Sequence, residues 1–149
     1  MIATATSLSA KTAAPEVATA HLDTFARDNL PPRDQWPEMI FTRPELQYPA
    51  RINCVAHFLD RWVERGRGDA PCIVSPTASY SYRELQALVN RIANVLVNDL
   101  GLVTGGRVLL RSANNPMMVA TYLAVLKAGG VVVATMPLLR AKELVYPIR

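Results

Sequence analysis

The sequence holds few residues of the kinds that usually carry chemistry. Its 149 residues include two cysteines, Cys54 and Cys72, and two histidines, His21 and His57. None of the four falls in a CxxC or Cys/His spacing that suits a metal. We therefore expect no metal site, two buried thiols in a reducing compartment, and histidines that pack on helix faces or at the surface.

Glycine is also scarce, and its seven positions fall at helix ends and tight turns. No Gly-rich loop ends in Lys-Ser or Lys-Thr, the pattern that cradles a phosphate. Ser75-Pro-Thr-Ala-Ser79 has hydroxyls without glycine or lysine and predicts a hairpin turn. Gly105-Gly106 precedes a strand, so it offers no helix N-terminus to an anion. Because His57 and Cys54 share a helix face with core residues, we expect no catalytic residue in this chain.

Long hydrophobic runs are missing as well. The most apolar segment, Met117 to Leu126, is far shorter than the ~20 residues of a membrane span. The first residues are rich in Ala, Thr and Ser and lack the apolar run of a secretory signal. The sequence therefore predicts a disordered tail over residues 1–18 and a cytoplasmic protein without a membrane partner.

The net charge of +4 comes mainly from scattered arginines. Only Arg61 to Arg67 forms a local cluster, which Glu64 and Asp69 dilute. A nucleic-acid interface concentrates Lys and Arg on one face, often beside aromatic residues, and no segment does both. We expect a solvated helix end here and no nucleic-acid partner.

The front of the chain predicts a helix followed by a connector. Glu16 to Asn29 is amphipathic, and Leu30-Pro-Pro-Arg33 ends the helix because proline lacks the backbone donor. From Asp34 to Tyr48 prolines interrupt any regular element. Its large apolar side chains predict a segment that drapes over a larger body and is anchored there.

A helix capped by Asn53 is predicted next, ending at Gly66 and Gly68. Its expected buried stripe is Cys54, Val55, Phe58, Leu59, Trp62 and Val63. A short buried strand, Pro71 to Ser75, and a second strand, Tyr80 to Tyr82, follow on either side of the turn.

The rest of the sequence predicts an α/β fold. Apolar residues at three- and four-residue steps indicate a long helix from Arg83 to Leu100 that stops at Gly101. Strand Arg107 to Arg111, helix Met117 to Lys127 and strand Val131 to Thr135 then form a βαβ unit with parallel strands flanked by helices. Since that helix is apolar nearly all round, we expect both its sides to be covered.

Several motifs occur in a fixed order along the chain. They are Tyr80-Ser-Tyr-Arg-Glu-Leu85, Gly105-Gly-Arg-Val108, Asn114-Asn-Pro116, Leu126-Lys-Ala-Gly-Gly130 and Pro137-Leu-Leu-Arg-Ala-Lys-Glu-Leu144. As a set they resemble the start of the AMP-forming acyl-CoA synthetases, the adenylate-forming superfamily. The front portion, with Asn29-Leu-Pro-Pro32, Leu46-Gln-Tyr-Pro49, Asn53-Cys54 and Arg65-Gly-Arg-Gly-Asp69, is most similar to 2-aminobenzoate-CoA and benzoate-CoA ligases.

This resemblance implies the βαβ-containing N-terminal portion of the ligase large domain. Residues 19–149 would be a partial α/β domain that stops before the phosphate-binding loop. Such a ligase joins an aryl carboxylate to ATP, with Mg²⁺, and then lets the CoA thiol displace AMP. The family's catalytic residues have no match here, so we expect the isolated chain to be inactive and to bind ATP, Mg²⁺ and CoA poorly.

One segment is implied to touch a ligand. In relatives the turn after the second strand lies near the CoA nucleotide, which corresponds to Met136, Pro137 and Arg140, with Arg140 pairing with a phosphate. The alternative is that Arg140 and Lys142 lie on a surface helix that begins after Pro137.

A different class of function stays open beside the ligase. An open sheet edge and an uncovered apolar helix favour a non-catalytic docking module that binds the rest of the ligase or a second copy. The sequence leaves open which carboxylate is activated, the oligomeric state, and whether residues 145–149 stay helical across Pro147.

Overall fold

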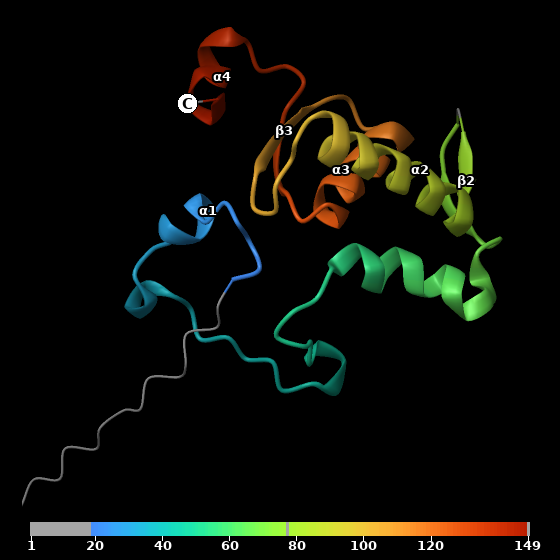
Figure 1. The fold of residues 1–149 in the computed structure, drawn as a ribbon, viewed down its shortest axis with the longest axis horizontal. Helices are drawn as coiled ribbons and strands as arrows, with labels where there is room; N and C mark the ends of the chain where they lie inside the picture. The colour runs from blue at the N-terminus through green and yellow to red at the C-terminus, as the bar shows by residue number, and fades with distance from the viewer. Residues whose placement is uncertain (1–18, 77, 149) are drawn as a thin grey trace, which may run out of the picture.

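The centre of the fold is the predicted βαβ unit. The computed structural model describes residues 19–76 and 78–148, so the expected tail over residues 1–18 lies outside the described residues. Strand β3 (Arg107–Arg111) is followed by helix α3 (Pro116–Lys127) and strand β4 (Val131–Thr135). The strands pair in parallel without a register shift, and α3 lies against them (Figure 1). The predicted α/β fold is confirmed.

Helix α3 begins where the sequence predicts. The side chain of Asn115 accepts a hydrogen bond from the Met118 amide at 2.8 Å, and Pro116 occupies the first turn. This cap satisfies a donor that the helix leaves unpaired. Only one face of α3 is covered in this chain: Met117, Val119 and Tyr122 are exposed, so the expectation of cover on both sides is wrong here.

Helix α2 (Tyr82–Asn94) packs against α3. It continues through η5 (Val95–Asp99), a π-helical turn, which is wider than an α-helical turn and is called a wide turn below. Ser81 and Glu84 cap its start reciprocally, through side-chain hydrogen bonds to each other's amides. The chain leaves the helix at Gly101, whose φ of 66° favours glycine. The core forms mainly where α2 and α3 meet strand β3 and the helix over residues 54–67. Its buried residues are Val55, Leu59, Leu85, Val89, Leu96, Leu110, Ala120, Ala124 and Val125.

The helix predicted after Asn53 is present over residues 54–67 and contains two wide turns, η3 (Ala56–Asp60) and η4 (Val63–Arg67). The Asn53 side chain caps it by accepting from the amide of Val55. Val55 and Leu59 are buried as expected, whereas Phe58 is 60% exposed. The Phe58 prediction is wrong because wide turns change the angular step between residues, so a 3.6-residue period misplaces that side chain.

The predicted hairpin consists of β1 (Pro71–Val74) and β2 (Ser79–Ser81), which pair antiparallel. Val74 is 77% exposed, so β1 is not the buried strand that its apolar residues predict. The pair forms a separate two-stranded sheet and has no second layer over Val74. Cys54 and Cys72 are likewise half-buried rather than fully buried thiols.

The helix expected over Glu16 to Asn29 is largely wrong. Its first residues lie outside the described part of the chain, and within that part only α1 (Phe25–Asp28) is helical. The amides of Leu22 and Asp23 instead donate to the carbonyl oxygen of Thr104, at 3.0 and 2.9 Å. Bonding to a distant loop therefore replaces the local helical bonds of this segment.

The connector has the irregular course that its prolines predict. Short helical turns η1 (Arg33–Gln35) and η2 (Pro44–Leu46) interrupt it, and it runs apart from the βαβ unit before returning at residue 53 (Figure 1). Its expected anchors are exposed in this chain. They are Trp36, Met39, Ile40, Phe41 and Leu46.

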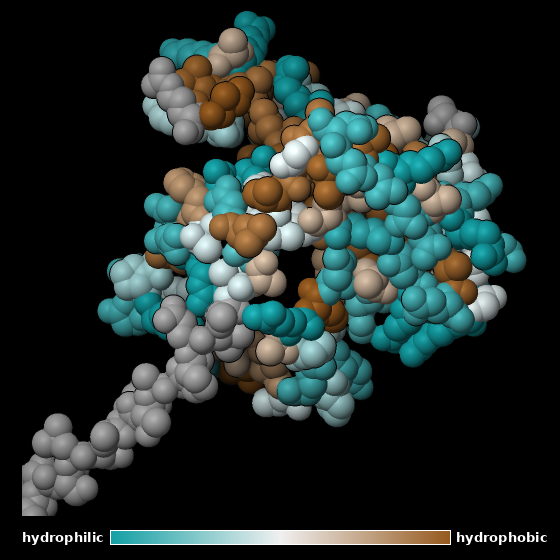
Figure 2. Space-filling model, in the orientation of Figure 1, coloured by the Kyte–Doolittle hydropathy of each residue, from teal (hydrophilic) through white to brown (hydrophobic). Residues whose placement is uncertain are grey.

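Helix α4 (Ala141–Ile148) remains helical across Pro147, which answers the question that the sequence left open as far as residue 148. Figure 2 shows hydrophobic side chains on α4 and on the segment leading into it. Leu138 and Ile148 are 81% and 66% exposed. No helix in the described part of the chain combines the length and hydrophobicity needed to cross a bilayer.

Candidate functional site

The carboxyl ends of β3 and β4 form the edge at which parallel α/β sheets usually bind ligands. Arg111 ends β3, and β4 runs directly into residues 136–140, which we call the 136–140 turn. Met136, Pro137 and Arg140, the three residues implied by the family resemblance, all lie in this turn. The structure therefore brings the sequence-predicted residues together at one sheet edge.

The backbone of Arg140 is held at the start of α4, while its side chain is exposed. Its amide donates to Glu143 Oε2 at 2.5 Å, and its carbonyl accepts from the amide of Glu143 at 3.0 Å. Among the residues that the structure describes, no acidic group pairs with its guanidinium. This placement also satisfies the alternative prediction, a basic residue at the start of a surface helix.

Arg111 fixes the turn, and the sequence analysis missed it. One nitrogen, Nη2, donates to the carbonyl oxygens of Pro137 and Leu139, at 2.6 and 2.9 Å. Charge-assisted hydrogen bonds of this kind are stronger than neutral ones. An arginine at a strand end has no sequence signal for such a role, because its partners are backbone carbonyls.

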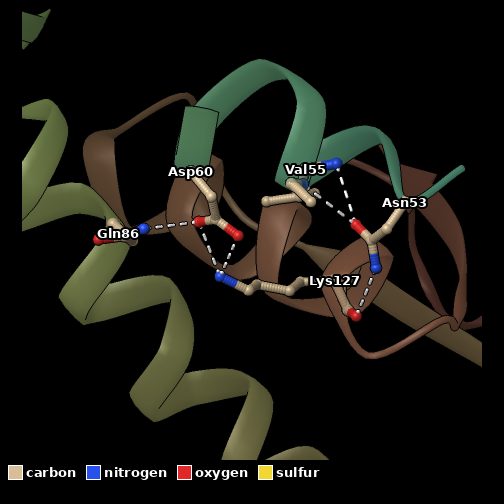
Figure 3. Close-up of polar contacts among 6 residues, drawn as sticks. Asn53, Val55, Asp60, Gln86 and Lys127 are labelled. Atoms are coloured by element: carbon tan, nitrogen blue, oxygen red, sulfur yellow. Dashed lines mark hydrogen bonds and ion pairs between the residues drawn. The ribbon is translucent and has the colours of Figure 1, made fainter. Parts of the chain in front are cut away.

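A second polar cluster lies where α3 ends, within the Lys-Ala-Gly-Gly motif (Figure 3). Lys127 Nζ lies 2.8 Å from each carboxylate oxygen of Asp60, and Gln86 donates to Asp60 Oδ1 at 2.9 Å. Asn53 Nδ2 donates to the carbonyl oxygen of Lys127 at 2.9 Å. The cluster thus joins the helix over 54–67 to both α2 and α3.

The Lys127–Asp60 pair is shielded, with side-chain exposures of 22% and 14%. Asp60 accepts hydrogen bonds from both Lys127 and Gln86, while Lys127 and Asn53 also line a cavity at the amino end of β4. The arrangement fixes three helices relative to one another, which gives Lys127 a structural role.

A large cavity lies at the other end of β4, where the strand begins. Its volume is about 760 Å³, and it separates the N-terminal segment from the βαβ unit, where Figure 2 shows the surface hollowed. Its walls include His21, Arg51, Cys54, Thr104, Tyr122 and Val131. It therefore lies apart from the 136–140 turn.

Neither a nucleophile nor a metal centre emerges from the described residues. Burial raises the pKa of the Cys72 thiol, and a weaker opposing hydrogen bond with Tyr82 lowers it, so the thiol is held in its unreactive protonated form. No group of three or more His, Cys, Asp or Glu in the described ranges suits a metal ion. His57 packs edge-on between the rings of Tyr48 and Phe58, as the sequence predicts for a histidine on a helix face.

These features define a class: an α/β scaffold with a basic turn at the carboxyl edge of parallel strands. The pattern of the AMP-binding enzyme family matches residues 59–149. The chain therefore belongs to the AMP-binding enzyme family.

Curated relatives are consistent with this placement. The chain is 32% identical over 105 residues to a 3-hydroxybenzoate–CoA/4-hydroxybenzoate–CoA ligase of Thauera aromatica, covering 70% of this chain and 20% of that protein. It is 38% identical over 97 residues to a 3-hydroxybenzoate–CoA ligase of Aromatoleum sp. strain CIB, covering 65% and 18%. The chain thus spans about a fifth of the length of these relatives.

A solved structure gives the same result for the fold. ATP-bound MatB from Rhodopseudomonas palustris superposes with a TM-score of 0.59 at 32% identity, over 64% of this chain and 18% of that one. The α/β scaffold is therefore that of the adenylate-forming ligases, as the motifs predicted.

Proposed function

We propose that this chain forms part of an aryl-carboxylate–CoA ligase and contributes scaffold to its N-terminal subdomain. The observation that carries the proposal is its similarity to two hydroxybenzoate–CoA ligases, at 32% identity over 105 residues and 38% identity over 97 residues. The whole enzyme would use ATP, Mg²⁺ and CoA, act in the cytoplasm, and form an acyl-adenylate before the thioester. The remainder of the ligase is then the partner of this chain.

Within that enzyme, Met136, Pro137 and Arg140 contact the CoA nucleotide. The exposed guanidinium at the carboxyl edge of β3 and β4 supports this assignment, since arginine binds phosphate oxygens through paired donors. The residues that activate ATP come from elsewhere in the ligase, because the sequence has no Gly-rich loop ending in Lys-Ser or Lys-Thr and no cluster in the described ranges has the ligands for a metal ion. The carboxylate is an aromatic acid, with benzoate, hydroxybenzoates and 2-aminobenzoate as the candidates.

A segment exchange tests the proposal. The matching residues of the Aromatoleum 3-hydroxybenzoate–CoA ligase are replaced by those of this chain, giving what we call the exchange ligase. We expect the exchange ligase to form aryl-CoA from ATP, CoA and 3-hydroxybenzoate. As a control for mispacking, a second exchange takes the same segment from the Thauera relative. A folded exchange ligase without activity, beside an active Thauera exchange, would refute the proposal.

A further inference from the structure

We infer that Arg111 is a positioning residue that holds the 136–140 turn in the conformation that receives the CoA nucleotide. The inference rests on the proposed function for the identity of the ligand. The hydrogen bonds of the Arg111 side chain to the turn carry it, and they do not depend on any relative.

The Arg111 side chain makes two hydrogen bonds to the backbone of the 136–140 turn, and we call this pair of bonds the clamp. Arg111 Nη2 bonds to the carbonyls of both Pro137 and Leu139, at 2.6 and 2.9 Å. The two carbonyls flank Leu138, which is 81% exposed, so packing of that side chain contributes little to fixing the turn. Inside the turn the Leu139 amide donates to the Met136 carbonyl at 3.1 Å.

The clamp also sets where Arg140 lies. Arg140 follows directly on the second clamped carbonyl, and its own backbone is fixed by Glu143. A phosphate-binding arginine gains affinity when its backbone is held in the bound conformation, because less conformational freedom is lost on binding. Loss of Arg111 therefore weakens CoA binding without removing a group that touches CoA.

The first test is kinetic and uses the exchange ligase. Arg111→Ala and Arg140→Ala should each raise the KM for CoA about tenfold, the effect of losing one charge-assisted contact. The KM for 3-hydroxybenzoate and kcat should stay unchanged. Arg111→Lys should recover part of the loss, since one ammonium reaches a carbonyl but lacks the guanidinium geometry. Arg91→Ala, an exposed position on α2, is the matched control.

The second test separates the clamp from the ligand. Hydrogen exchange at the Leu139 amide of this chain should accelerate in Arg111→Ala and not in Arg91→Ala. Unchanged exchange would overturn the clamp. If Arg140→Ala raises the KM for CoA and Arg111→Ala does not, the positioning role is wrong while the proposed function stands. If Arg140→Ala leaves that KM unchanged, the nucleotide contact itself fails.

Discussion

At the scale of single residues, Lys127 and Asp60 illustrate how a motif can be informative without being catalytic. The ammonium and carboxylate are shielded, and Gln86 completes the cluster (Figure 3). Removal of one partner leaves the other charge desolvated and unpaired, which costs more than the pair itself contributes.

We predict that Lys127→Met lowers the free energy of unfolding by about 1–3 kcal/mol, the range for losing charged hydrogen bonds in a partly shielded site. Urea unfolding measures this. The double variant Lys127→Met/Asp60→Leu should lose less than the sum of the two single variants. Lys142→Met, on exposed α4, serves as the control. An unchanged midpoint for Lys127→Met would rule out the structural role.

The cap of α2 predicts a response to pH. The Ser81 amide, followed by the Ser81 hydroxyl, lowers the pKa of the Glu84 carboxyl from its ordinary value, and a smaller effect of burial opposes this. Because the folded-state pKa is the lower one, the cap stabilises the fold above the unfolded-state pKa. That stabilisation is lost as the pH falls through the folded-state pKa.

Thermal unfolding between about pH 6 and pH 3 measures this response, since an unperturbed glutamate titrates near 4.3. Glu84→Gln keeps the hydrogen-bonding side chain of a capping box but cannot titrate. We expect its midpoint to fall less than that of the unaltered chain over this range. Glu38→Gln, an exposed residue of the connector, should follow the unaltered chain. Parallel curves for all three would show that the cap does not respond to pH.

At the scale of elements, the sequence predicted best where a local signal and a tertiary contact agree. The Asn115 cap, the β-branched run of β4 and the glycine stop after α2 all predicted elements that the structure contains. The prediction of a helix over Glu16 to Asn29 failed because part of this segment bonds through its backbone to Thr104, which is far away in the sequence. Arg111 was missed for the same reason, since its partners come from another element.

Gly105 lies where the N-terminal segment contacts the loop before β3, and we call this contact the joint. Its φ is 87°, and a Cβ there would overlap the carbonyl oxygen of Asp23. Arg107 reinforces the joint through an ion pair with Asp23 at 3.1 Å and by stacking on Phe25. The close approach explains why only glycine fits at the start of the Gly-Gly-Arg-Val motif.

We predict that Gly105→Ala destabilises the chain more than Gly66→Ala does. Both positions have positive φ, but a Cβ at Gly66 meets nothing within 4 Å. Gly66→Ala should therefore show only the conformational cost of about 1 kcal/mol, whereas Gly105→Ala adds the clash. Urea unfolding of the two variants provides the comparison. Equal losses would show that the N-terminal segment does not pack on the joint.

At the scale of the whole molecule, much apolar surface remains open in this chain. The outer face of α3, the connector and α4 all expose large hydrophobic residues (Figure 2). Exposed patches of this kind mark surfaces that pack against other protein. We propose the remainder of the ligase as that protein. Self-association through the open edges of β3 and β4 is the competing outcome.

The central claim is that this chain is ligase scaffold and that its chemistry needs the rest of the enzyme. Carboxylate-dependent release of pyrophosphate from ATP tests it most directly, with the isolated 149-residue chain and the exchange ligase in the same assay. We predict no release by the isolated chain and release by the exchange ligase on addition of 3-hydroxybenzoate. Release by the pure isolated chain, or none by a folded exchange ligase, would contradict the account.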